Sequence, residues 1–322
     1  MNRRDLLTRA ALLAGGLGGA WWLRDNVLWR DPGVVFPADG SSGWLPYDEP
    51  RASVPTVLVT VAGQTIRALV DSGAQYSVID RGLFDLLGLT RAFDLPLIAY
   101  GVGGGAQMGR GTTLDLTVGA MRVEKLRAAI LSLGPLAMRD GLSAPLILGQ
   151  DLLGETVLEL DTVEHRLRFL RAADHTTPSD VSPIPVGRKG SALSTQVTVE
   201  GATIEAVVDT GASALLALGR DAAVGAGLLD GRPTRRTSSI VLGGAIAAEV
   251  VLARTITVGD RLYREAEVPI YADVSLPGFP SALLGMEAFE GRTLLMDLGR
   301  GRLHISDGTD VQTLPRRGRG TA

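Results

Sequence analysis

The same pattern occurs twice in the chain, and this internal repeat constrains the fold more than any other feature of the sequence. Residues 56–79 and 195–218 each contain an apolar run, a glycine turn, a second apolar run and an Asp-Ser/Thr-Gly triplet. Asp71 of the first copy matches Asp209 of the second. Because the separation of the copies is far longer than the period of solenoid or propeller repeats, each copy is predicted to be a lobe with its own core.

Small insertions and deletions change the register of the repeat along the chain. Compared with the two acids, the counterparts Val118 and Val258 lie slightly further apart in sequence, and Gly149 and Gly285 lie slightly closer together. Fixed landmarks separated by such small changes in spacing indicate a duplication.

The repeat also predicts how the chain is divided. The first lobe is expected at residues 51–172 and the second at 191–306, joined by a linker at 173–190 that is rich in Pro, Ser, Thr and Asp. The remaining segments are predicted to be an export signal or N-terminal anchor (1–30), a linker (31–50) and a disordered tail (307–322).

Composition favours lobes built mostly from β-strands. Val, Ile, Leu and Thr recur in brief alternating runs that are interrupted by many of the 41 glycines. One short helix is expected in each lobe, at 81–87 and at 221–227, and each ends near a glycine that suits a left-handed C-terminal cap. The net charge of −3 gives no nucleic-acid signal, and the absence of cysteine excludes disulfides and thiol chemistry.

The residues that carry chemistry are the two acids of the repeat. Asp71 and Asp209 each stand at the end of an apolar run and are followed by Ser-Gly-Ala or Thr-Gly-Ala. One Asp-Ser/Thr-Gly triplet is a common turn, but two at the same place in a repeat indicate a functional pair. Both copies also contain a later hydrophobic-hydrophobic-Gly element, which ends at Gly149 and at Gly285.

This combination resembles the active-site signature of the aspartic peptidase clan, and the resemblance covers about residues 50–306. The alanines after the triplet glycines make the chain more similar to retropepsins and their bacterial relatives than to the larger eukaryotic pepsins. The resemblance implies a mostly β, bilobal acid-protease fold, in which two duplicated retropepsin-like β-barrel lobes are related by a pseudo-twofold axis.

The implied activity is that of an aspartic endopeptidase with Asp71 and Asp209 as the catalytic pair. Two carboxyls at hydrogen-bond distance cannot both ionise cheaply, so they share one proton, and aspartic proteases are the established example. The ionised acid then takes a proton from water while the protonated acid donates to the peptide carbonyl. This chemistry requires neither a metal nor a cofactor, and since one chain supplies both acids, a monomer is expected.

Supporting roles follow from the same resemblance. The hydroxyls of Ser72 and Thr210 are expected to bond across to the opposite lobe. Gly73 and Gly211 are expected to let the backbone turn tightly and approach the carboxylates, where a side chain would clash.

A glycine-rich run at residues 97–106 has two interpretations. Its Gly-x-Gly-x-x-Ala resembles a dinucleotide fingerprint, but that motif requires a following helix, and residues 112–118 alternate like a strand. The run is instead similar to the pepsin flap, a hairpin that closes over bound peptide. The expected flap residues are Tyr100, Gly101, Gly103 and Gly104, with a buried strand aromatic as the alternative role for Tyr100. A smaller tip is expected at 242–245.

One rival function belongs to a different class. A non-catalytic retropepsin-fold protein would bind or scaffold peptides without cutting them, and its mark would be the loss of one acid of the pair. Both acids are present. The three histidines are isolated in the sequence and do not form a metal-ligand motif.

The N-terminus indicates the compartment. Arg3 and Arg4 precede a Leu/Ala/Gly-rich stretch at 10–23, which resembles a twin-arginine export signal. We therefore expect a bacterial protein that is exported to the periplasm. The alternatives are an uncleaved membrane anchor, which would be its one membrane contact, and an ordinary amphipathic N-terminus on a cytoplasmic peptidase.

Overall fold

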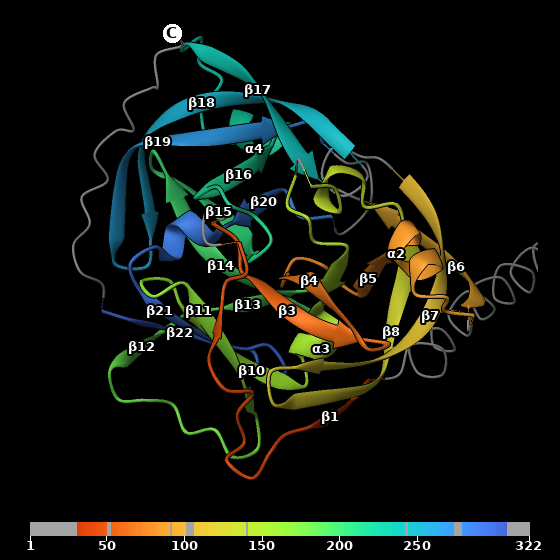
Figure 1. Cartoon of the computed structure of the whole chain (residues 1–322). Helices are drawn as coiled ribbons and strands as arrows, with labels where there is room; N and C mark the ends of the chain where they lie inside the picture. Colours follow the sequence, from red (N-terminus) through yellow and green to blue (C-terminus); the bar gives the residue numbers. More distant parts are fainter. Residues whose placement is uncertain are drawn as a thin grey trace, which may run out of the picture.

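The computed structural model describes residues 31–49, 53–90, 92–100, 106–139, 141–241, 244–273 and 279–307. These residues are mostly β-strand with a few short helices, and they form two lobes side by side (Figure 1). The first lobe lies at the right of this view in orange and yellow, and the second at the upper left in green and blue. The two-lobed, mostly β architecture predicted from the repeat is confirmed.

The first lobe is built on an eight-stranded sheet. Its strands are β1 (Gly33–Val35), β3 (Thr56–Val61), β4 (Gln64–Val70), β5 (Ser77–Asp80), β6 (Ala92–Tyr100), β7 (Ala106–Val118), β8 (Met121–Leu131) and β9 (Leu146–Leu148). They are hydrogen-bonded in the order β1-β8-β5-β9-β4-β3-β7-β6, and β7 also pairs with β8. This additional pairing closes six of the strands into a barrel.

The second lobe repeats the six barrel strands and the hairpin strand β6, but its additional edge strand borders a different barrel strand. Its strands are β13 (Gly187–Lys189), β14 (Ala192–Val199), β15 (Ala202–Val208), β16 (Leu216–Gly219), β17 (Thr234–Val241), β18 (Gly244–Val258), β19 (Arg261–Tyr271) and β20 (Ala282–Leu284). Their order is β13-β14-β15-β20-β16-β19-β18-β17, and β14 also pairs with β18 to close the barrel. The duplication read from the sequence is therefore a duplication of the whole barrel.

Tight hairpins place the acid-bearing strands β4 and β15 in register. The turn between β3 and β4 uses Ala62 and Gly63, with φ of 48° and 76°, and the turn between β14 and β15 uses Glu200 and Gly201, with φ of 48° and 94°. Two successive residues with positive φ give a two-residue turn whose twist matches that of the flanking strands. Each hairpin thus fixes where its acid leaves the barrel.

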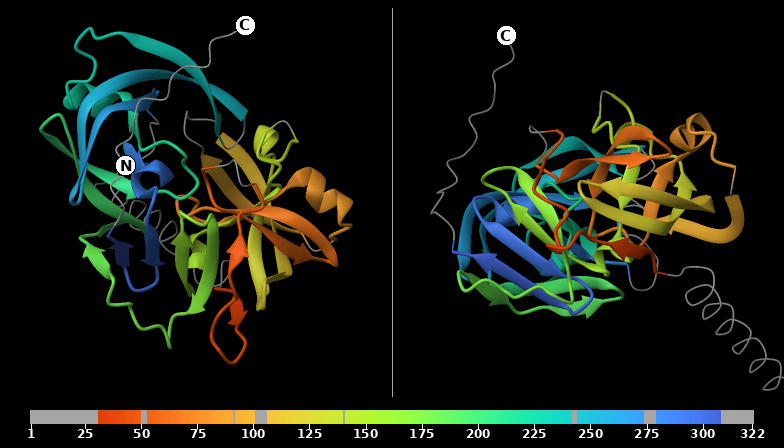
Figure 2. Two further views of the ribbon diagram at one scale, coloured as in Figure 1. Left: turned by 60° about the vertical axis from the view of Figure 1, so that its left-hand side comes forward. Right: turned by 60° about the horizontal axis from the view of Figure 1, so that its bottom comes forward.

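A third sheet joins the two lobes. Its six strands are β2 (Leu45–Pro46), β10 (Thr156–Asp161), β11 (Arg166–Arg171), β12 (Val181–Ile184), β21 (Thr293–Asp297) and β22 (Arg302–Ser306). In the order β12-β22-β21-β10-β11-β2, the first three strands come from the second half of the chain and the last three from the first half (Figure 2, lower part of the left view). The two halves meet where β21 pairs with β10. We call this third sheet the interlobe sheet.

The register of the interlobe sheet locates the axis that relates the lobes. Glu159 of β10 pairs with Leu295 of β21, which is its own counterpart in the register of the repeat that Gly149 and Gly285 define. The flanking pairs Leu158–Met296 and Leu160–Leu294 are then related to each other by a twofold rotation. The pseudo-twofold axis therefore passes through the Glu159–Leu295 pair.

The two predicted helices are present with boundaries shifted by one or two residues. They are α2 (Arg81–Leu86) and α4 (Arg220–Gly225). Each ends with a glycine in the left-handed region, Gly88 at φ 60° and Gly227 at φ 71°. The amide of Leu89 donates to the carbonyl of Phe84, and that of Leu228 donates to Ala223, so both helices end in the same Schellman-type cap.

The segments predicted as linkers are partly built into the sheets. Strands β1 and β2 lie within residues 31–50, and β12 and β13 lie within residues 173–190. The main hydrophobic core continues through both lobes and includes Leu158 and Leu160 of β10 and Leu294 and Met296 of β21. Within the described residues, no helix has the length and apolarity needed to cross a membrane.

Candidate active site

The two predicted acids meet between the lobes. Asp71 follows β4 and Asp209 follows β15, and their carboxyl groups are hydrogen-bonded to each other. The backbone behind each acid is held identically, because the amide of Asp71 donates to Leu148 (3.0 Å) and that of Asp209 donates to Leu284 (2.9 Å). The parallel pairs β4–β9 and β15–β20 supply these carbonyls, which explains the hydrophobic-hydrophobic-Gly element of each copy.

The hydroxyls of Ser72 and Thr210 cross between the lobes. Ser72 Oγ donates to the Val208 carbonyl (2.8 Å) and accepts from the Thr210 amide (3.0 Å). Thr210 Oγ1 likewise donates to the Val70 carbonyl (2.8 Å) and accepts from the Ser72 amide (2.9 Å). Both side chains are fully buried, so these four reciprocal bonds satisfy backbone groups that have no access to water.

Each triplet glycine packs directly against the acid of the opposite lobe. A Cβ atom added at Gly73 would lie 2.6 Å from Cγ of Asp209, and one added at Gly211 would lie 2.5 Å from Cγ of Asp71. Neither glycine has a positive φ, so the turn alone does not require it. Close approach is the reason for glycine here, since any side chain would push the two acids apart.

The glycines of the hydrophobic-hydrophobic-Gly elements are equally constrained. A Cβ atom at Gly149 would lie 2.6 Å from the carbonyl carbon of Tyr76, and one at Gly285 would lie 2.2 Å from the carbonyl oxygen of Ala214. After each glycine the chain turns back to the acid loop, where the amide of Gln150 donates to Ala74 (2.9 Å).

Backbone amides also bind the carboxylates. The amides of Gly73 (2.8 Å) and Ala74 (3.0 Å) donate to Oδ1 of Asp71, and the amide of Gly211 donates to Oδ1 of Asp209 (2.8 Å). Such donors favour the ionised form of a carboxyl group. The triplet loops therefore prepare both acids to carry negative charge.

The surroundings nevertheless shift the pKa values of the two acids by different amounts. Burial raises the pKa of Asp209 well above its ordinary value, and the neighbouring Asp71 charge and the hydrogen bond to Asp71 raise it further. Burial also raises the pKa of Asp71, but the hydrogen bond from Asp209 and the amides of Gly73 and Ala74 oppose this rise. Both shifts favour a pair that holds one proton between its two carboxyl groups, and the pKa of Asp209 is the more strongly raised.

The sequence prediction missed Gln150. Its side chain is buried, with 7% of its surface exposed, and its Nε2 donates to the carbonyl of Ser72 (2.7 Å). The second copy has Met286 at this position, so a search for residues shared by the two copies does not identify Gln150. A polar residue directly after the apolar Leu146–Gly149 element was the signal that could have identified it.

The predicted flap lies only partly within the described residues. Tyr100 is the last residue of β6, while Gly101, Gly103 and Gly104 lie outside them. Strand β7 begins at Ala106, so the glycine run leads into a strand, and the helix that a dinucleotide fingerprint requires does not follow. In the second lobe β17 and β18 form the matching hairpin, in which Val241 pairs with Gly244 across a two-residue tip.

The histidines occupy two settings, since His175 and His304 both lie near Asp297 whereas His165 packs against an aromatic ring. The His165 ring packs edge-on against Tyr47 with 5.7 Å between centroids, and burial lowers the pKa of both His175 and His304. Among the residues that the structure describes, no group of three or more His, Asp or Glu side chains could hold a metal ion.

The comparison with family models agrees with the duplication. A family model described as aspartyl protease matches residues 57–152 and, a second time, residues 195–288. Among solved structures, basic 7S globulin from soybean is similar at 9% identity and a TM-score of 0.44, over 86% of this chain and 95% of that chain. Conglutin gamma from lupine seeds is similar at 11% identity and a TM-score of 0.47, over 86% and 96%. No curated protein sequence matches the chain.

Proposed function

The chain belongs to the aspartyl protease family, and from this premise we propose that it is an aspartic endopeptidase whose catalytic pair is Asp71 and Asp209. The observation that carries the proposal is the contact between these two carboxyls, which come from equivalent loops of the two lobes and share one proton. A pair that served only as turn residues would not need four reciprocal bonds to hold its loops together.

In the proposed reaction the two acids have different roles. Ionised Asp71 takes a proton from a water molecule as that water attacks the peptide carbonyl carbon. Protonated Asp209 donates its proton to the carbonyl oxygen. When the tetrahedral intermediate collapses, Asp71 passes the proton taken from water to the departing nitrogen, the C–N bond breaks, and Asp209 regains a proton from a hydroxyl of the intermediate. The raised pKa of Asp209 supports its role as the acid, because the group must still hold a proton when substrate arrives.

The proposed substrate is an extended segment of a peptide or protein. Two hairpins, β6–β7 and β17–β18, stand at matching places in the two lobes, and an extended peptide can form strand-like hydrogen bonds with such elements. Tyr100, Gly101, Gly103 and Gly104 are the proposed flap residues on the first hairpin. We also propose that the protein acts as a monomer and is exported, as its N-terminal sequence indicates.

The rival proposal is a protein that binds peptides without cutting them. It would leave the carboxyl pair as a structural contact, so replacing either acid would alter peptide affinity or stability but not turnover. Retention of both acids in mutual contact, each also bound by backbone amides, favours catalysis.

Conservative replacement of each acid tests the proposal. Asp71→Asn and Asp209→Asn are each expected to reduce cleavage of a peptide library by at least about 10⁴-fold, because each removes one partner of the proton transfer. Asp161→Asn is a matched control, since Asp161 also ends a strand but caps a surface turn and pairs with Arg166.

Circular dichroism should show that all three variants are folded. An Asn variant at either position that retains full turnover would overturn the proposal. Wild-type protein that binds library peptides but leaves them intact between pH 3 and pH 8 would favour the binding protein.

A further inference from the structure

Gln150 breaks the symmetry of the candidate active site. It stands directly after Gly149, where the second lobe has Met286 after Gly285. The backbone enters the acid loop in the same way in both copies, since the amide of Gln150 donates to Ala74 (2.9 Å) and that of Met286 donates to Ala212 (2.8 Å). At this position the lobes therefore differ in the side chain.

The carboxamide of Gln150 is held at both ends. Its Nε2 donates to the Ser72 carbonyl (2.7 Å), and its Oε1 accepts from the hydroxyl of Ser191. The orientation of the amide is fixed chemically, because a backbone carbonyl can only accept and so must face the NH₂ end. Ser191 lies in the β13–β14 turn of the second lobe, so this chain of bonds joins that turn to the first acid loop.

The bonded carbonyl belongs to the peptide unit that also binds Asp71. The Ser72 carbonyl and the Gly73 amide are two ends of one peptide group, and that amide donates to Oδ1 of Asp71 (2.8 Å). A hydrogen bond received at the carbonyl polarises the peptide group and strengthens the bond given by its amide. In the second lobe Met286 cannot donate such a bond to Thr210, so the amide of Gly211 lacks this support.

We propose that Gln150 is a positioning residue that makes the two acids unequal, by anchoring the Ser72–Gly73 peptide so that negative charge stays on Asp71 rather than on Asp209. The catalytic consequence of this inference rests on the proposed peptidase function. Its electrostatic content does not, because it concerns where the proton lies in the free protein.

The groups that face Asp71 are few. Asp209 is the titratable side chain that bonds to it, and the amides of Gly73 and Ala74 are its backbone donors. Asp209 has equivalent donors in Gly211 and Ala212. The two acids therefore have nearly the same direct contacts. Gln150 has no polar counterpart in the second lobe, and it acts on Asp71 only through the Ser72–Gly73 peptide group.

The test exchanges the two side chains between the lobes. In Gln150→Met the first macroscopic pKa of the pair, measured by ¹³C NMR of labelled aspartate carboxyls, is expected to rise by about 0.5, roughly threefold in the ionisation constant. In the double variant Gln150→Met with Met286→Gln, the ionised resonance is expected to move from Asp71 to Asp209. Spectra of Asp71→Asn and Asp209→Asn assign the two resonances.

Several variants keep the test decisive. Ser191→Ala frees the amide without removing it, so a smaller shift in the same direction is expected. Met286→Gln alone should reduce the difference in pKa between Asp71 and Asp209. This variant can still be measured if Gln150→Met does not fold. Gln64→Met, at an exposed strand position, is the matched control and should change nothing.

The outcomes separate a positioning role from a structural one. If the folded variants melt at lower temperature but titrate like wild type, Gln150 only packs, and the inference is overturned. If wild-type protein cleaves no peptide but the titration shifts as stated, the proposed function fails and the inference holds. If the protein is a peptidase, the acidic limb of its kcat/KM profile should move with the NMR titration.

Discussion

The two lobes hold the same backbone in place with different side chains, and the start of helix α2 compared with α4 shows how. In the first lobe Asp80 ends β5 and accepts bonds from the amides of Gly82 (2.9 Å) and Leu133 (3.0 Å). In the second lobe the counterpart of Asp80 is Gly219, and the counterpart of Leu133 is Asp273. Asp273 accepts from the amide of Asp221 (3.1 Å) at the start of α4.

The carboxylate that binds the start of the helix therefore comes from the residue before the helix in the first lobe and from the segment after β19 in the second lobe. A Cβ atom at Gly219 would lie 2.6 Å from Oδ1 of Asp273, so the two solutions exclude each other. The comparison teaches that the fold requires an acceptor at a point in space, while either of two chain segments can supply it.

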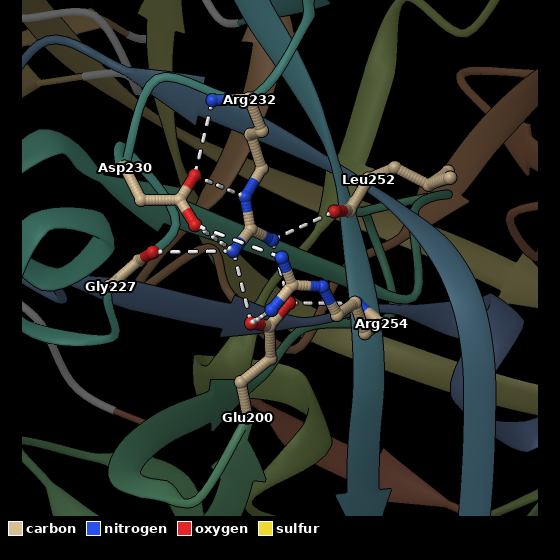
Figure 3. A network of polar contacts seen from close by, with 6 residues as sticks. All are labelled: Glu200, Gly227, Asp230, Arg232, Leu252 and Arg254. Atoms are coloured by element: carbon tan, nitrogen blue, oxygen red, sulfur yellow. Dashed lines mark hydrogen bonds and ion pairs between the residues drawn. The ribbon is translucent and has the colours of Figure 1, made fainter.

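Another difference between the lobes concerns the hairpin turns. Ala62 in the first turn corresponds to Glu200 in the second. The Glu200 carboxylate binds both terminal nitrogens of Arg232 (2.6 and 3.0 Å), and the same guanidinium binds Asp230 (Figure 3). Arg254 also approaches this cluster. The second turn is tied to strand β18 and the loop after α4 by charges that the first lobe lacks.

The largest effect should come from the hydroxyl bonds that the two lobes share. Thr210→Val and Ser72→Ala each leave one buried amide and one buried carbonyl without a partner, so each should lower the free energy of unfolding by roughly 2–5 kcal/mol. Urea titration measures it, and Thr203→Val at an exposed strand position is the control. A much larger loss in one lobe than in the other would break the symmetry described here.

The exchanged cap should give an intermediate effect. Asp273→Leu introduces the residue of the first lobe and should cost about 1 kcal/mol, because the amide of Asp221 loses its acceptor. Gly219→Asp alone should also destabilise, through its contact with Asp273. The two together should recover most of the wild-type stability in a thermal or urea double-mutant cycle. Purely additive losses would show that the acceptor position is not interchangeable.

The charged cluster should give the smallest effect, and one that depends on pH. Hydrogen bonding to Arg232 lowers the pKa of Glu200 below its ordinary value of 4.5. A depressed carboxyl pKa stabilises the fold above the unfolded pKa, and this contribution is lost as pH falls through the folded value. Arg232→Met should therefore lower the free energy of unfolding by about 0.5 kcal/mol at pH 7. The difference from wild type should shrink below about pH 4.

Arg235→Met is the control for this variant, because the Arg235–Glu267 pair is largely exposed. A difference that stayed constant from pH 7 to pH 3 would show that Arg232 acts through packing of its stem rather than through charge.

Much of the site could be predicted because its signals are local. The sequence alone shows an apolar run before each acid, and the repeat identifies Asp71 and Asp209 as counterparts. The C-terminal helix caps were equally readable, since Gly88 and Gly227 mark positions that favour left-handed backbone.

The interlobe sheet could not be predicted in the same way. Strand β2 has two residues and β12 contains Pro183, so both lack the length and alternation that identify a strand. They become strands because β11 and β22 offer edges with which they pair. Gln150 was missed for a related reason. A comparison of two copies identifies positions that agree, and the proposed role of Gln150 depends on its difference from Met286.

The continuous hydrogen bonding from β12 to β2 has a consequence for partial unfolding. If one half unfolds while the other persists, β10 or β21 becomes a bare edge, with a row of amides and carbonyls open to a strand from another molecule. Because β10 and β21 are counterparts in one repeat, the strand that best fits that edge belongs to a second copy of the same chain. Half-folded molecules should therefore exchange halves with each other, so that swapped dimers accumulate during refolding at high concentration.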